Sequence, residues 1–168
     1  GAGYDKNPSK VTADLQKLGV QIHFDDAVDA IPENFRNSSK ILIVYTPAIP
    51  KNNQVFNFYK KHDYNLMKRS VVLGLITRNT FCFAIAGTHG KTTTSAILAH
   101  ILYPYDATSF LGGISENYHS NFIPGKGKIS VVEADEYDKS FLQLFPNIAC
   151  ITSIDVDHLD IYQDADDL

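Results

Sequence analysis

The stretch FCFAIAGTHGKTTTSAILAHIL, residues 81–102, constrains the fold of this chain more than any other part of it. Its apolar start, residues 82–86, predicts a strand buried on both faces, as in parallel sheets. Its end predicts a helix that packs on the sheet and stops at Pro104. The residues expected to face the sheet are Ala96, Ile97, Leu98, Ile101 and Leu102.

The loop between this strand and this helix predicts a phosphate site. Gly87 and Gly90 let the backbone turn tightly and direct its N–H groups into one concavity, at the positive end of the helix. Lys91 adds a positive charge, and the Thr92 hydroxyl is placed to reach a phosphate-bound Mg²⁺. The loop is a shortened variant of G-x-x-x-x-G-K-[ST], with Ile85 at the first glycine position; the alternative is an ordinary strand–turn–helix with polar turn residues. The expected phosphate-binding residues are Gly87, Thr88, His89, Gly90, Lys91, Thr92 and Thr93.

Composition and charge narrow the class of protein. The 168 residues are 44% hydrophobic and 20% charged, as in ordinary globular proteins. The net charge of −4 and the lack of a Lys/Arg-rich run argue against nonspecific nucleic-acid binding. No apolar stretch approaches membrane-spanning length, and GAGYDKNPSK is not a signal peptide. Cys82 and Cys150 fall in predicted buried strands and form neither a disulfide framework nor a zinc site, so a cytoplasmic location is expected.

Helices and strands alternate along the chain, which predicts an α/β fold with parallel sheets and flanking helices. After Asn7-Pro8, a helix is expected to present Val11, Leu15 and Leu18 on one face. A glycine turn is expected at 109–113 and a polar loop at 115–128. The other expected helices contain residues 55–59 and 73–76, and the other expected strands are residues 20–24, 40–45, 129–134 and 148–154.

Four carboxylates gather in the segment EADEYD, residues 133–138. A solvated acidic turn is the ordinary interpretation. However, Glu133 ends a predicted buried strand opposite the phosphate loop, where an acid can hold the Mg²⁺ that bridges nucleotide phosphates. His158 lies beyond the next strand; a lone histidine is usually structural, but its flanking aspartates can orient it as a ligand of a second metal. The predicted metal ligands are Thr92, Glu133 and His158.

Four motifs in this order resemble the Mur ligase family of peptidoglycan-building enzymes. GTHGKTTTSAIL resembles the ATP loop of the family, SFLGGI its substrate loop, VVEADEYDKSFL its metal-bearing acidic strand and DVDHLDIY its histidine segment. The segment IVYTPAIPKNN resembles its N-terminal uridine-nucleotide domain. The resemblance implies a partial Rossmann-like UDP-binding domain at residues 1–70 and a partial P-loop-type central ATP-binding domain at residues 71–168.

The resemblance also implies an activity. The motifs are most similar to the family member that uses ATP and Mg²⁺ to join L-alanine to the carboxylate of UDP-N-acetylmuramate through an acyl phosphate. Lys91 is implied to neutralise the transferring phosphoryl group, Thr92 and Glu133 to hold one Mg²⁺, and His158 to hold a second; Lys91, Glu133 and His158 form the implied catalytic set. Asp5, Thr46 and Arg69 are implied to contact the UDP part. The other residues implied to bind substrate are Ser109, Phe110, Gly112, Gly113, Asp135 and Glu136.

Alternatives to this assignment stay open. One is a sibling ligase that attaches a recycled peptide to the same UDP-sugar. A second is a nonligating P-loop protein, such as a kinase or a nucleotide-dependent switch, and a third is a pure binding module. The resemblance further implies a fragment that is inactive on its own. The start AGYDKNPS is similar to the second strand of the family's N-terminal domain, which implies that the first strand and glycine-rich loop of that domain are lacking. At the other end, DADDL is implied to precede the rest of the ATP domain and the C-terminal domain. Ser153 stands where the family often has asparagine.

Overall fold

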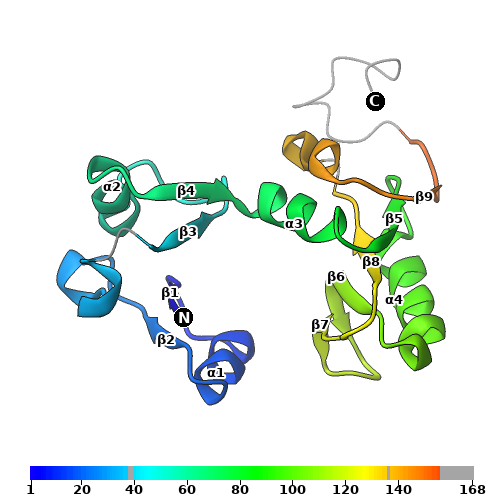
Figure 1. The fold of residues 1–168 in the computed structure, drawn as a ribbon, viewed down its shortest axis with the longest axis horizontal. Helices are drawn as coiled ribbons and strands as arrows, with labels where there is room; N and C mark the ends of the chain where they lie inside the picture. The colour runs from blue at the N-terminus through cyan, green and yellow to red at the C-terminus, as the bar shows by residue number, and fades with distance from the viewer. Residues whose placement is uncertain (38–39, 136, 156–168) are drawn as a thin grey trace. The chain divides into compact units, whose positions relative to one another are not determined.

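The computed structural model describes residues 1–37, 40–135 and 137–155, and the chain divides into two compact units, Gly1–Arg69 and Ser70–Leu168 (Figure 1). Both units combine parallel strands with helices, which confirms the predicted α/β class.

The first unit contains two separate βαβ elements. In each, two short parallel strands are joined through a helix, and the strands pair along their whole length. The first element comprises β1 (Ala2–Tyr4), α1 (Lys10–Lys17) and β2 (Gln21–His23). The second comprises β3 (Leu42–Tyr45), α2 (Gln54–Lys61) and β4 (Asn65–Lys68). The short 3-10 helices η1 (Val28–Ala30) and η2 (Glu33–Phe35) lie between the two elements.

Helix α2 is fixed at its start by side chains and along its length by a small core. The Asn53 side chain accepts a hydrogen bond of 2.7 Å from the N–H of Phe56, an N-cap that satisfies a donor left free at the helix start. Its apolar face buries Val55 and Tyr59 against Ile31. Tyr59 also donates a hydrogen bond of 3.1 Å to the carbonyl of Phe35.

Helix α1 forms where predicted but does not bury the predicted face. Ser9 caps its start and makes a reciprocal capping box with Thr12, which is the buried residue of this helix. Leu18 is 81% exposed, and Val11 and Leu15 are exposed too. The predicted helix therefore forms, but no element of the described chain buries Val11, Leu15 and Leu18. Helical periodicity identifies an apolar stripe but not the element that covers it.

The second unit is built on one five-stranded sheet of order β7-β6-β8-β5-β9. Strand β5 is paired in parallel with both β8 and β9, β6 is parallel to β8, and β7 is antiparallel to β6. Helix α4 lies against β5, β6 and β8 (Figure 1). The strands are β5 (Phe81–Ala86), β6 (Thr108–Ser115), β7 (Ser120–Ile123), β8 (Ile129–Glu133) and β9 (Ile148–Ile151). The helices are α3 (Arg69–Thr77), α4 (Lys91–Leu102), η3 (Tyr103–Tyr105) and η4 (Tyr137–Gln143).

Two local predictions in this unit are wrong. The expected glycine turn at 109–113 lies within the extended strand β6, and the expected polar loop contains strand β7. The two strands form a hairpin in which Phe110 and Phe122 pack with ring centroids 5.2 Å apart. Pairing across the sheet thus overrides the local preference of adjacent glycines for a turn.

In this unit, side chains on the central strands of the sheet are more buried than those on the edge strand β9. Cys82, Ala84 and Val132 form a buried cluster on the central strands. Cys150 is exposed, contrary to prediction, because β9 is the edge strand and all four of its residues are exposed. No helix within the described ranges is long and apolar enough to cross a membrane.

Helix α4 buries a different set of residues from the one predicted. Ile97 and Ile101 were expected to face the sheet but are 57% and 59% exposed. Ser95 and Ala99 are buried instead. The small side chains on this face suit the close contact of α4 with the strands.

Candidate functional site

The loop that joins β5 to α4 has the backbone conformation that its glycines predicted. Gly87 and Gly90 have φ values of 120° and 80°, a region that favours glycine. Gly90 is the N-cap of the 12-residue helix α4, and no side chain from the described part of the chain caps it by a hydrogen bond. The first N–H groups of a helix lack intrahelical partners and carry its positive dipole end, so this helix start can receive an anion.

Lys91 folds back over the loop. Its Nζ donates a hydrogen bond of 2.6 Å to the carbonyl of Gly87 and lies 3.5 Å from the carbonyl of Thr88. The ammonium group is thereby held at the loop, where it can meet phosphate charge.

The segment that follows β9 forms a second wall of the loop. The N–H of Thr88 donates to the carbonyl of Ser153, and the N–H of His89 donates to its hydroxyl, both at 3.0 Å. The Thr152 hydroxyl donates to the carbonyls of Ala86 and His89. The expectation that the glycine turn directs the N–H groups of the loop into one concavity therefore does not hold for Thr88 and His89, whose N–H groups are bonded to Ser153.

This second wall also explains why residue 87 is glycine. A Cβ at this position would lie 2.4 Å from the Thr152 hydroxyl oxygen and 2.8 Å from the backbone nitrogen of Ser153. Thr152 and Ser153 were missed as site residues in the sequence analysis. The signal that could have found them is their place directly after a strand that pairs with β5.

Asp155 lies at the same loop. Its N–H donates to the Thr88 hydroxyl at 3.1 Å, and its Oδ2 lies 3.8 Å from Nε2 of His89. The pair forms an ion pair when the histidine is protonated. Both side chains are largely exposed, so this interaction adds little to the stability of the loop.

Glu133 ends β8 opposite the start of α4, and its carboxylate accepts three hydrogen bonds. The Thr92 hydroxyl donates to Oε1 at 3.0 Å. The Ser95 hydroxyl, at 3.3 Å, and the N–H of Gly112, at 2.8 Å, both donate to Oε2. The Thr92 hydroxyl and the Glu133 carboxylate provide the hard oxygen ligands that Mg²⁺ prefers. The residues present thus fit a magnesium ion that is completed by water and phosphate oxygens.

The two glycines of β6 lie beside the two candidate metal ligands, Gly112 against Glu133 and Gly113 against Thr92. A Cβ at Gly112 would lie 2.3 Å from Oε1 of Glu133, and a Cβ at Gly113 would lie 3.1 Å from Cγ2 of Thr92. The other two predicted residues of the same strand are placed differently. Ser109 is fully buried, and Phe110 packs on Phe122.

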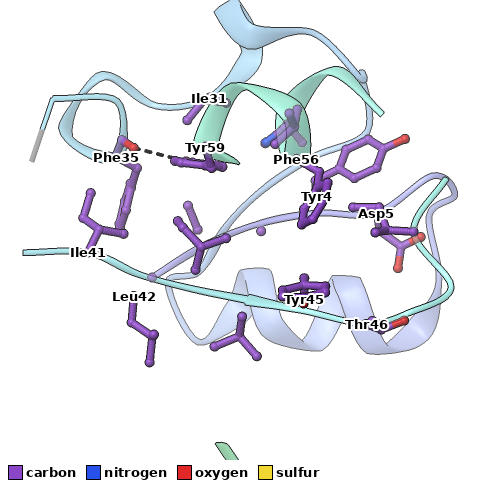
Figure 2. A pocket seen from close by; sticks show the side chains of 18 of the residues that line it. Tyr4, Asp5, Ile31, Phe35, Ile41, Leu42, Tyr45, Thr46, Phe56 and Tyr59 are labelled. Carbon is purple, nitrogen blue, oxygen red and sulfur yellow. Dashed lines mark hydrogen bonds between the residues drawn. The ribbon is translucent and has the colours of Figure 1, made fainter. Parts of the chain in front are cut away.

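Three of the predicted UDP-contacting residues, Asp5, Thr46 and Arg69, lie in the first unit. Asp5 and Thr46 both line a cavity of about 480 Å³ between β1, β3 and α2, and Figure 2 shows them among its lining side chains. Each is tied to its own loop: Asp5 accepts from the N–H of Asn7 at 3.0 Å, and Thr46 accepts from the N–H of Ala48 at 3.1 Å. Arg69 begins α3.

Of the remaining predicted residues, the structure describes only Asp135. Asp135 is exposed just after β8, while Glu136 and His158 lie outside the described residues. Within the described ranges there is no cluster of three or more His, Cys, Asp or Glu residues suited to a metal ion. The candidate metal ligands that the structure places together are therefore Thr92 and Glu133.

Comparisons with known proteins point to one family. Residues 85–168 match the model of the Mur ligase middle domain. The chain is 55% identical over 166 residues to the UDP-N-acetylmuramate–L-alanine ligase of Flavobacterium psychrophilum, a match that covers 97% of this chain and 37% of the relative. The chain therefore spans little more than a third of the length of the curated relatives it matches.

Solved structures agree with this fold. The UDP-N-acetylmuramate–alanine ligase of Thermotoga maritima is 31% identical with a TM-score of 0.81, covering 95% of this chain and 36% of that one. The UDP-N-acetylmuramate:L-alanyl-gamma-D-glutamyl-meso-diaminopimelate ligase of Neisseria meningitides is 23% identical with a TM-score of 0.79, covering 97% of this chain and 55% of that one. The second likeness shows the fold alone.

Proposed function

The chain belongs to the Mur ligase family, and from this premise we propose that it contributes the nucleotide-binding part of an ATP-dependent ligase of peptidoglycan precursor synthesis. The whole protein joins L-alanine to the carboxylate of UDP-N-acetylmuramate and works in the cytoplasm. In this proposal residues 1–70 bind the UDP part, with Asp5, Thr46 and Arg69 contacting it, and residues 71–168 bind ATP.

The observation that carries the proposal is the hydrogen bond of 3.0 Å between the Thr92 hydroxyl and Glu133. It supports a magnesium–nucleotide site because it joins an acidic strand end to the first turn of the helix that follows the phosphate loop. An acid in this place is typical of enzymes that bind nucleotide phosphates through Mg²⁺. The 55% identity to an alanine-adding ligase supports the choice of substrate.

The proposed chemistry is acyl transfer through an activated carboxylate. The carboxylate oxygen of UDP-N-acetylmuramate attacks the γ-phosphorus of ATP, and ADP leaves. The amine of L-alanine then attacks the carbonyl carbon of the acyl phosphate, loses a proton and expels phosphate as the amide forms.

The residues of this chain have distinct roles in that chemistry. Lys91 and the N–H groups at the start of α4 stabilise negative charge on the phosphoryl group during its transfer. Thr92 and Glu133 hold Mg²⁺, which supplies further neutralisation of phosphate charge when it is bound. Gly112 and Gly113 let strand β6 lie close to Glu133 and Thr92. His158, which lies outside the described residues, would hold a second Mg²⁺ that would supply further neutralisation of phosphate charge.

One experiment separates this function from its alternatives. Phosphate release from ATP by the full-length protein is measured with UDP-N-acetylmuramate and either L-alanine or the tripeptide of the peptide-attaching ligases. We expect L-alanine to stimulate release and the tripeptide to have no effect. Stimulation by the tripeptide alone would identify the sibling ligase. Release that needs neither amine nor UDP-sugar would identify a nonligating P-loop protein.

A further inference from the structure

Ser95 is a buried polar residue that has no role in the proposed function described above. It lies on α4 one turn after Thr92, and its side chain is fully buried. Its hydroxyl is within hydrogen-bond distance of two acceptors, the carbonyl of Thr92 at 3.1 Å and Oε2 of Glu133 at 3.3 Å. A serine hydroxyl has one proton to donate, so it is shared between the helix backbone and the carboxylate.

The two oxygens of the Glu133 carboxylate have different partners. Oε2 accepts from two groups, the Ser95 hydroxyl and the N–H of Gly112. Oε1 accepts from the Thr92 hydroxyl. Each carboxylate oxygen has room for about two hydrogen bonds or ligands. Among the described residues, Oε2 therefore has two hydrogen-bond donors, while Oε1, beside Thr92, has one and keeps room for a further ligand.

We propose that Ser95 is a positioning residue for magnesium binding. It anchors Oε2 of Glu133 together with the backbone of Gly112, and this anchoring fixes the rotamer that presents Oε1 beside Thr92. The inference rests on the proposed role of Thr92 and Glu133 as metal ligands. Groups that hydrogen-bond a metal-ligating carboxylate fix its orientation, and loss of one typically weakens metal affinity by about 10–100-fold.

Gly112 contributes to the same arrangement through its missing side chain. A Cβ at this position would lie 2.3 Å from Oε1 and 2.6 Å from Cδ of Glu133, closer than real Cβ contacts allow. The carboxylate is therefore packed onto bare backbone on one side and onto the Ser95 hydroxyl on the other. The metal ligand on β8 is in this way tied to strand β6 and helix α4 together.

The test measures Mn²⁺ affinity, with Mn²⁺ as a paramagnetic substitute for Mg²⁺, by electron paramagnetic resonance of the full-length protein in the presence of ADP. Ser95→Ala is expected to weaken Mn²⁺ binding by about 10–100-fold, while ADP affinity without metal is unchanged. Ser130→Ala is the matched control: Ser130 is also fully buried, on the same strand as Glu133, and its hydroxyl bonds to Thr80 at 2.6 Å. This control is expected to bind Mn²⁺ as the wild type does.

The pair Ser95→Thr and Ser95→Val carries the test if Ser95→Ala does not fold. These two side chains have nearly the same shape and differ in a hydroxyl against a methyl. Ser95→Thr keeps the hydroxyl and is expected to bind Mn²⁺ with the wild-type affinity. Ser95→Val lacks the hydroxyl and is expected to bind Mn²⁺ more weakly. Equal Mn²⁺ affinities in both members of the pair would overturn the inference.

The inference about Ser95 can fail while the proposed function stands, and Glu133→Ala distinguishes the two failures. If Glu133→Ala weakens Mn²⁺ binding but Ser95→Ala leaves it at the wild-type value, Ser95 has no positioning role. If Glu133→Ala also binds Mn²⁺ as the wild type does, the proposed metal site itself is wrong. An equal loss in Ser95→Ala and Ser130→Ala would show a general loosening of the core and would also overturn the inference.

Discussion

The hydroxyl of Thr92 donates a hydrogen bond of 3.0 Å to Oε1 of Glu133, across 41 residues of sequence. The contact arises because β8 pairs in parallel with β5, so the end of β8 comes level with the loop that leads into α4. Parallel strands direct their carboxyl ends to one edge of a sheet, where ligands of such sheets bind.

Replacing Glu133 by alanine is expected to raise the Mg²⁺ concentration needed for ligation. The change removes the carboxylate beside Thr92 and leaves the buried Ser95 hydroxyl without one of its acceptors. The measurement is a Mg²⁺ titration of initial rates in the full-length protein. Glu116→Ala, at an exposed site between β6 and β7, is the control with the same loss of charge. If the Mg²⁺ titration of Glu133→Ala overlays that of the wild type, the acidic segment is only a solvated turn and does not bind the metal.

Replacing Lys91 by alanine is expected to abolish ligation with little loss of fold. The carbonyl of Gly87 holds Lys91 Nζ at the loop. In this position the positive charge of Lys91 stabilises the negative charge of the phosphoryl group during its transfer. Removing one such stabilising group costs about 10²–10³ in turnover, roughly 2.7–4 kcal/mol. The measurements are turnover and thermal unfolding, with Lys126→Ala at an exposed site as the control. Wild-type turnover in Lys91→Ala would reject the phosphate-loop assignment.

Replacing Gly87 by alanine is expected to destabilise the second unit more than replacing Gly90. Both residues have positive φ, and backbone strain of this kind costs about 1–3 kcal/mol. The Cβ at residue 87 would also meet the Thr152 hydroxyl at 2.4 Å, whereas the nearest atom to a Cβ at residue 90 is 3.9 Å away. Urea unfolding of both variants measures the difference. Equal losses of unfolding free energy would show that the segment after β9 does not pack on the loop.

The two cysteines are expected to react with a thiol reagent at very different rates. Cys150 is exposed on the edge strand β9. Cys82 is fully buried in β5, and burial raises the pKa of its thiol, so less of the reactive thiolate is present at neutral pH. Labelling of the native 168-residue chain should show one fast and one slow thiol. Cys150→Ser should remove the fast phase; persistence of that phase would contradict the assigned burial.

Local sequence patterns predicted the central part of the second unit well. The strand–loop–helix at residues 81–102 and the strand that ends at Glu133 both follow from apolar runs bounded by polar or glycine residues. The positive φ angles of Gly87 and Gly90 follow from the tight turn that a phosphate loop requires.

Other features depended on contacts that no local pattern contains. Ser153 reaches the loop only because β9 pairs with β5, and Cys150 is exposed only because β9 is the sheet edge. In the sequence Ser95 is an ordinary polar helix residue. Its contact with Glu133 arises only because α4 packs against β8. Two adjacent glycines favour a turn, which is why Gly112 and Gly113 were predicted to form one. They lie instead in β6, where the Glu133 carboxylate and Thr92 leave little room for side chains.

In the proposed function, the whole protein activates the carboxylate of UDP-N-acetylmuramate with ATP and passes the acyl group to L-alanine. The most direct measurement uses UDP-N-acetylmuramate labelled with oxygen-18 in that carboxylate and follows the label by mass spectrometry. Because the carboxylate oxygen that attacks ATP leaves with the phosphate, we expect labelled phosphate to appear in equal amount to the amide product, and only when L-alanine is present. Phosphate free of the label in a reaction that consumes ATP would contradict the account.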